Sequence, residues 1–134
     1  MLIFAHESLS AALLKGVLGS AHAAIGMSYH FCTFALSQGV PAISLYTGDY
    51  YRQKAIGLSS FWGDERLALA IEELAAHGLD RVQAVFTDES LRARLDVRAR
   101  DAAQEWQAGF KRNILRPLRE LALPSGSFIG TPMA

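Results

Sequence analysis

One long stretch of the chain carries no formal charge. Residues 16–48 contain no Asp, Glu, Lys or Arg, and before Asp49 the only charged side chains are Glu7 and Lys15. Glycines and a proline interrupt this stretch, and it holds two histidines and several serines, so it lacks the composition of a membrane span. A segment this apolar is typically buried on both faces, as parallel strands and their covering helices are.

Short strands and helices are predicted to alternate in this half of the chain. An isolated Rossmann-like domain usually has more strands, so we expect part of the sheet to be missing from this chain or supplied elsewhere. The alternation itself predicts an α/β fold, a partial Rossmann-like domain with a small parallel sheet of two or three strands. The expected strands are residues 2–4, 23–26 and 41–46, and the expected helices run from Ser8 or Ser10 to about Gly19 and from Tyr29 to Gln38, with Gly39 after it.

The second half of the chain is charged and predicts helices. One helix is expected from an Asp64 cap to Gly78, with further helical turns at Val82, Val85 and Phe86, and a longer one from a Thr87 or Asp88 cap to a stop or kink at Pro117. We expect a single α/β domain over residues 1–123 and a loose tail over residues 124–134. The apolar stripe of the longer helix comprises Leu91, Leu95, Ala99, Ala102, Trp106, Phe110 and Ile114.

Composition excludes several classes of function. The formal net charge is zero, whereas a broad nucleic-acid surface needs an excess of Lys and Arg. The single cysteine, Cys32, lies in an apolar run and is expected to be a small buried side chain rather than a nucleophile. His6, His22 and His77 are scattered without metal-ligand spacing. No signal peptide is recognised, and we expect a cytoplasmic protein without a metal site.

The loop after residues 23–26 has the composition of an anion site. In open parallel sheets, ligands bind beyond the carboxyl ends of the strands. Ser28 can cap the following helix or donate to a ligand oxygen, at a helix end that attracts anions. His30, in the first turn, can donate a hydrogen bond or transfer a proton near neutral pH. A plainer interpretation is also open, in which Ser28 only caps the helix and His30 is a core histidine.

Aromatic and basic side chains follow the next strand. Tyr50, Tyr51, Arg52 and Lys54 lie in or after this loop, and Lys54 could place a positive charge against a phosphate or carboxylate. Because one helix joins the two strands, we expect them to be neighbours, with both loops at the same edge of the sheet. The alternative is a solvated lysine on an amphipathic helix, beside tyrosines that simply pack.

Three features of residues 16–58 occur together. They are the Ser28-Tyr29-His30 turn, a Phe-Ala-Leu-Ser-x-Gly-Val-Pro passage at residues 34–41, and a Tyr-Tyr-x-x-Lys-x-x-Gly-Leu segment at residues 50–58. In this combination the stretch resembles the C-terminal domain of polysaccharide pyruvyl transferases. The passage at residues 34–41 is shared with two-domain glycosyltransferases of the GT-B type. The turn and the last segment together are more specific.

The resemblance implies a GT-B-like enzyme of two Rossmann-like domains with the active site between them, this chain being the C-terminal part. Its reaction would move a pyruvyl group from phosphoenolpyruvate to a pair of sugar hydroxyls in exopolysaccharide biosynthesis, without a further cofactor. Many family members have Arg-x-His at the turn; here Ser28 takes the arginine position, which passes the donor-binding role to Lys54 or Arg52. By the resemblance His30 is the catalytic residue, and the donor-binding residues are Ser28, Tyr29, Tyr50, Tyr51, Arg52 and Lys54.

Two other functions remain open from the sequence. One is a GT-B glycosyltransferase with a nucleotide-sugar donor, for which Asp49 is the only acidic residue in the two loops. The other is a non-catalytic domain that binds a sugar or a protein partner. The expected partners are a small-molecule donor and a saccharide acceptor, with no nucleic acid. An open half-sheet could also form a homo-oligomer or pair with an N-terminal domain outside this chain.

Overall fold

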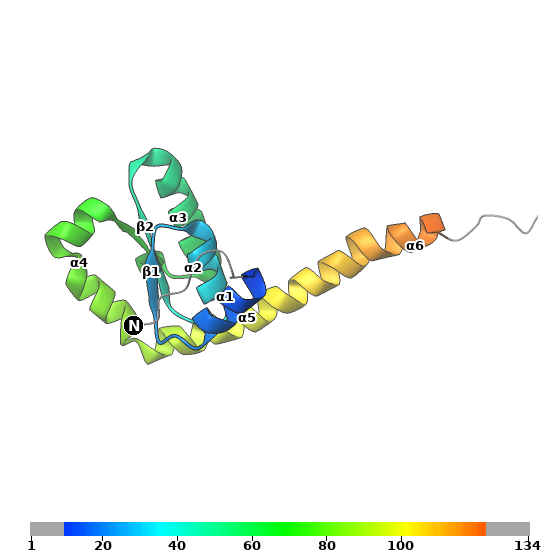
Figure 1. Cartoon of the computed structure of the whole chain (residues 1–134), viewed down its shortest axis with the longest axis horizontal. Coiled ribbons are helices and arrows are strands. Elements are labelled where there is room, and N and C mark those ends of the chain that lie inside the picture. The colour runs from blue at the N-terminus through cyan, green and yellow to red at the C-terminus, as the bar shows by residue number, and fades with distance from the viewer. Residues whose placement is uncertain (1–9, 123–134) are drawn as a thin grey trace, which may run out of the picture. The chain divides into compact units, whose positions relative to one another are not determined.

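A three-stranded parallel sheet organises the computed structural model, which describes residues 10–122 (Figure 1). β1 (Ala24–Gly26), β2 (Ala42–Tyr46) and β3 (Ala68–Ala70) lie in the order β1-β2-β3, and both neighbouring pairs are parallel. The predicted α/β class with a small parallel sheet is therefore confirmed. The expected strand at residues 2–4 and the expected tail at 124–134 lie outside the described residues.

Helices connect and follow the strands. They are α1 (Ala11–Gly19), α2 (Tyr29–Leu36), α3 (Gly48–Trp62), α4 (Ile71–Phe86), α5 (Glu89–Phe110) and α6 (Arg116–Ala122), with a 3-10 turn at Glu65–Leu67 and a π-helical turn at Lys111–Leu115. The chain divides into two units after Arg100. The expectation of one domain over residues 1–123 stays a prediction. None of the described helices is both long enough and apolar enough to cross a membrane.

The two faces of the sheet are covered by different helices. Figure 1 shows α2 and α3 on one side of the sheet and α4 on the other. Right-handed crossovers between sequential parallel strands place their helices on one face, which accounts for α2 and α3. Alternate residues of a strand point to opposite faces, and Ala42, Ile43 and Ser44 of β2 are all buried. The prediction of burial on both faces is therefore confirmed for the first residues of β2, whereas Ile25 of β1 is exposed.

Cys32 lies at the centre of the contact between α2 and the sheet. Its side chain is fully buried, and the thiol Sγ donates to the carbonyl oxygens of Gly26 at 3.5 Å and Ile43 at 3.7 Å. Burial raises the pKa of the thiol, against the lowering effects of hydrogen bonds with Ser44 and Gly26. The thiol therefore stays protonated, which confirms that Cys32 is a buried packing residue.

The predicted helix caps in the first half are confirmed, whereas α2 ends at Leu36 rather than at Gln38. Ser10 caps α1, where its Oγ accepts from the Leu13 N–H at 3.2 Å, and Ser28 caps α2, where its Oγ accepts from the Phe31 N–H at 3.4 Å. Gly39 follows α2 with a φ of 72°, in the left-handed region that glycine adopts after helices. The chain then enters β2 within a few residues.

The predicted helix from Asp64 to Gly78 is wrong at both ends, because α4 runs from Ile71 to Phe86. Asp64 caps only the 3-10 turn, and the apolar residues that follow pair with β2 as β3. Gly78 does not end a helix but is buried inside α4, where an added Cβ would lie 3.0 Å from Leu74 Cδ1 and 3.2 Å from the Glu73 carbonyl oxygen. A larger residue at Gly78 would therefore crowd its neighbours in α4, and this tight packing, rather than a helix stop, accounts for the glycine.

The predicted long helix is confirmed at its start and differs at its end. Asp88 Oδ1 accepts from the Leu91 N–H at 2.9 Å, as a cap does. Pro117 does not stop the helical path, because the π turn comes just before it and α6 contains it. Leu91 and Leu95 of the predicted stripe are buried, whereas Trp106, Phe110 and Ile114 are exposed.

Two groups of arginine contacts hold the first unit together. Arg66 Nη2 lies 2.6 Å from Asp64 Oδ2 and 2.8 Å from Asp88 Oδ2, and Arg94 adds a contact of 3.2 Å to Asp64 Oδ2. On the same helix as Arg94, Arg92 donates to the carbonyl oxygens of Ala21, at 3.2 Å, and His22. These contacts connect α5 to the turn before β3 and to the segment before β1.

Asp64→Asn is expected to destabilise the fold by about 1–3 kcal/mol, because it removes a buried charged acceptor from Arg66 and Arg94. The pKa of Asp64 is lowered, chiefly by the hydrogen bond from the Arg66 side chain. Its contribution is therefore present above the unfolded-state pKa of about 4 and is lost as the pH falls through the folded-state value.

Urea unfolding near neutral pH and again at about pH 3 measures both effects. The variant should lose less stability than the wild type on acidification. Asp80→Asn, at an exposed position on α4, removes the same charge and is the matched control. Equal unfolding midpoints for the two variants would contradict the stabilising role of the contacts that Asp64 makes with Arg66 and Arg94.

Gly48→Ala is expected to destabilise the fold by about 1 kcal/mol. Gly48 begins α3 with a φ of 72°, and an added Cβ would meet no atom within 4 Å, so the cost is backbone strain alone. Gly57, in the interior of the same helix, also has open space around it. Gly57→Ala should stabilise the protein by roughly 0.5–1 kcal/mol. Thermal unfolding of both variants checks this, and shifts of the same sign would refute it.

Candidate functional site

The carboxyl ends of the three strands meet at one edge of the sheet. β1 ends at Gly26, β2 at Tyr46 and β3 at Ala70, and the parallel pairing places these ends side by side. The prediction that the loops after β1 and β2 are neighbours is confirmed. α2, α3 and α4 all begin at this edge, so three helix N-termini, each with free N–H groups, converge there.

The loop after β1 presents His30 to solvent. Ser28, Tyr29 and His30 are all exposed, so the interpretation of His30 as a core histidine is wrong. The His30 ring lies edge-on to Tyr29, with ring centroids 5.7 Å apart, and 6.4 Å from the Phe34 ring. No described residue forms a hydrogen bond with the imidazole. Both ring nitrogens are therefore available to a ligand, while Ser28 acts as the cap.

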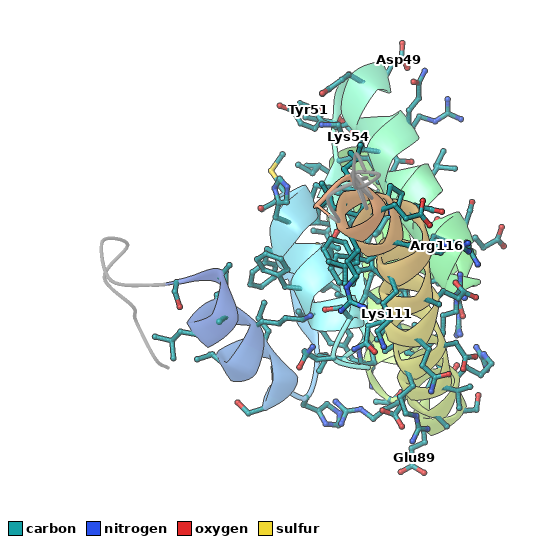
Figure 2. All side chains as sticks on the ribbon, turned by 90° about the vertical axis from the view of Figure 1, so that its right-hand side faces the viewer. Asp49, Tyr51, Lys54, Glu89, Lys111 and Arg116 are labelled. Carbon is teal, nitrogen blue, oxygen red and sulfur yellow. The ribbon has the colours of Figure 1, made fainter. Side chains whose placement is uncertain are left out.

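The first turns of α3 carry an aromatic and cationic cluster. Lys54 Nζ lies over the Tyr50 ring, 4.4 Å from its centroid, and the Tyr50 and Tyr51 rings meet edge to face at 5.1 Å. Figure 2 shows Asp49, Tyr51 and Lys54 at the same end of α3. Arg52 is exposed on this turn as well. The tyrosines thus do more than pack in the interior. Both are exposed, Tyr50 contacts the ammonium group of Lys54, and Tyr51 contacts Tyr50.

The electrostatics of Lys54 connect the two loops. Its pKa is raised, first by a hydrogen bond with Tyr50, which desolvation opposes, and to a lesser extent by the charges that Tyr50, Tyr51 and Tyr29 carry when ionised. Tyr29 belongs to α2, whereas the other tyrosines belong to α3. A lysine held in its cationic form serves as an anchor for an anion rather than as a base.

Sequence reasoning missed an acidic residue at this edge. Thr47 Oγ1, after β2, donates to Glu72 Oε1 at 3.3 Å, and Glu72 lies in the first turn of α4. It was missed because residues 64–78 were interpreted as one helix, which hid β3 and its carboxyl end. The signal available was the run Leu67-Ala68-Leu69-Ala70 following Gly63 and Asp64, which is compatible with a short buried strand.

A cleft of about 490 Å³ lies beside β2 and β3. Glu73 and Arg81 of α4 line both this cleft and a second one of similar volume along α4. None of the residues predicted for the donor lines either cleft; they lie on exposed turns at the strand ends. The first cleft is lined by Tyr46, Ile56, Ser59, Ser60, Glu65, Arg66, Ala68, Glu73 and Arg81.

The candidate site offers acid–base and anion-binding groups. Over residues 10–122, no group of three or more His, Cys, Asp or Glu side chains is arranged to hold a metal ion. The groups present are an imidazole, an ammonium, a guanidinium, three phenols and two carboxylates. They can bind an anion and transfer a proton.

The chain matches no protein-family model, and neither a curated protein nor a solved structure shows significant similarity to it.

Proposed function

We propose that this chain is the C-terminal part of a pyruvyl transferase, which moves a pyruvyl group from phosphoenolpyruvate to a pair of sugar hydroxyls. The observation that carries the proposal is that an exposed imidazole, His30, and a cationic Lys54 lie on neighbouring turns at one edge of a parallel sheet. Ligands of such sheets bind at that edge. The Ser-Tyr-His turn and the Tyr-Tyr-x-x-Lys segment support the choice of this family.

The donor carries two anionic groups, and the site offers cations and helix N-termini for them. Lys54 and Arg52 on α3 would bind the phosphate or the carboxylate, and the free N–H groups at the start of α2 would add to this. Tyr50 and Tyr51 would hold the ammonium of Lys54 toward the ligand. This division assigns to α3 the role that an arginine has at the Ser28 position in many family members.

His30 would supply the proton that starts the reaction. Protonation of the methylene carbon converts the enol phosphate of the donor into a cation at the adjacent carbon. One sugar hydroxyl attacks that carbon and passes its proton to the imidazole. The second hydroxyl then attacks the same carbon as its C–O bond to phosphate breaks, inorganic phosphate leaves with the proton of that hydroxyl, and the cyclic ketal closes. His30 thus acts first as a general acid and then as a general base.

The saccharide acceptor would be bound mainly by an N-terminal domain outside this chain or by a second copy. The enzyme would act in the cytoplasm, where phosphoenolpyruvate is present, on precursors of exopolysaccharides. Phosphoenolpyruvate is a substrate here, and no cofactor is proposed.

A GT-B glycosyltransferase with a nucleotide-sugar donor is the second candidate, and Glu72 favours it. Sequence reasoning offered only Asp49 as an acidic partner for a ribose. The Thr47–Glu72 pair supplies another carboxylate at the carboxyl edge of the sheet, where a ribose hydroxyl could donate to it. The two candidates therefore differ in the group used: His30 and Lys54 for a pyruvyl donor, and Glu72 for a nucleotide sugar.

An amide NMR titration of the chain with phosphoenolpyruvate, inorganic phosphate and UDP-glucose distinguishes the candidates. Phosphoenolpyruvate should shift residues around Ser28 and Lys54 and bind more tightly than phosphate. A hydrogen bond to a charged group contributes about 1.5–3 kcal/mol. His30→Ala and Lys54→Gln should therefore each weaken phosphoenolpyruvate binding roughly ten- to a hundredfold.

Matched controls separate site effects from general ones. His77→Ala and Lys111→Gln remove the same kinds of group from exposed positions elsewhere and should leave binding unchanged. Binding of UDP-glucose alone, abolished by Glu72→Gln, would replace the proposal with the glycosyltransferase. Binding of a saccharide without any response to either donor would favour a non-catalytic sugar-binding domain.

A further inference from the structure

The second unit of the chain exposes large apolar side chains along a helical path. No residue whose burial is described between 101 and 121 is buried. The exposed fraction ranges from 38% for Phe110 to 82% for Leu121 in a set of five. An isolated helix of this length is marginal in water, and helices gain most of their stability from packing an apolar face. The set consists of Trp106, Phe110, Ile114, Leu118 and Leu121.

These side chains form one stripe, and the π turn keeps them on it. Positions four apart advance by about 40° around an α-helix, so a stripe of such steps drifts around the axis. The π turn at Lys111–Leu115 rotates by a smaller angle per residue, because its hydrogen bonds join residues five apart. At its end, the Arg116 N–H donates to the Lys111 carbonyl oxygen. Four residues in the π turn therefore rotate by less than a full turn. The step from Phe110 to Ile114 reverses the rotation about the helix axis that the steps before and after it add.

The stripe begins with a stacked aromatic pair. The rings of Trp106 and Phe110 stack with centroids 5.3 Å apart and an interplanar angle of 10°. A stacked aromatic pair presents a flat apolar surface at low entropic cost. Such a surface is typical of a protein interface, in which Trp and Phe are enriched.

Charge divides this helical segment into two halves. Residues 101–110 carry Asp101 and Glu105 and no basic residue, so their formal charge is −2. Residues 111–122 carry four basic residues and Glu120, which gives +4 − 1 = +3. Glu120 lies 3.0 Å from Arg116 Nε, so it already has a partner. Figure 2 labels Lys111 and Arg116 from the basic half.

We propose that this helical stripe docks against the same stripe of a second copy of the chain, with the two helices antiparallel. Antiparallel pairing places the acidic half of each copy against the basic half of the other, whereas parallel pairing in register places +3 beside +3. The arrangement is isologous about a two-fold axis near Arg112, which places Trp106 opposite Leu118 and Phe110 opposite Ile114 of the second copy, so it closes as a dimer. The apolar stripe supplies the contact area, and the charge division selects the orientation.

Sedimentation analysis of the full chain over a range of concentrations tests the proposal. The wild type should be a dimer that dissociates on dilution. Phe110→Gln with Leu118→Gln should weaken dimerisation at least tenfold, a magnitude typical of buried apolar anchors. The matched control is Leu79→Gln, at a site on α4 that is 76% exposed, which should leave the dimer unchanged. Far-ultraviolet circular dichroism confirms that each variant is folded.

Charge exchange tests the orientation. One variant reverses the acidic half (Asp101→Lys with Glu105→Lys), and another reverses part of the basic half (Lys111→Glu with Arg119→Glu). Each alone should dimerise more weakly than the wild type, because both halves then carry the same sign. Mixed together, the two variants should form a heterodimer. Self-association of each reversed variant at wild-type strength would overturn the antiparallel arrangement.

Two results would overturn the proposal as a whole. One is a wild-type chain that stays monomeric at every concentration. The other is binding to vesicles of anionic lipid that Phe110→Gln with Leu118→Gln abolishes, in a chain that does not self-associate; the stripe would then be a membrane-binding surface. A blue shift of Trp106 fluorescence that rises with protein concentration, without vesicles, supports the dimer.

Discussion

The fold depends on β2, the central strand, and on the absence of charge around it. β2 pairs with β1 on one side and β3 on the other, and its first three residues are buried. A charged side chain there would have no water and no partner on either face. The uncharged residues 16–48 therefore supply β1, β2 and the covering helix α2, whereas β3 and the charged helix α4 come from the second half of the chain. Every strand end at the candidate site is aligned by this one strand.

Sequence patterns predicted the parts of the fold that rest on local signals. Ser10, Ser28 and Asp88 each cap a helix through a hydrogen bond within three residues, and such bonds follow from residue type and spacing. β3 could not be predicted in the same way. Its three residues are too few to show alternation, and it exists because β2 offers it hydrogen bonds. Periodicity alone favoured a helix for residues 64–78, whereas pairing with a distant strand decided the outcome.

In the candidate site, too, the features that follow from local patterns were predictable and those that depend on distant contacts were not. The loops after β1 and β2 were predictable, because a helix between two parallel strands makes them neighbours. Glu72 was not, since it follows the strand that was missed. The proximity of Tyr29 to Lys54 was also beyond prediction, because it depends on how closely α2 packs on α3. No local pattern in the sequence states how closely two helices pack.

The contact of Arg92 with the carbonyl oxygens of Ala21 and His22 has a consequence for how the protein is made. It joins residues about seventy positions apart, and the core around Ile43 and Leu36 also includes Val85, Leu91 and Leu95. While the ribosome is still making α4, the sheet lacks these side chains. The uncharged stretch is therefore synthesised before part of its cover, and its apolar side chains stay exposed until α5 has been made.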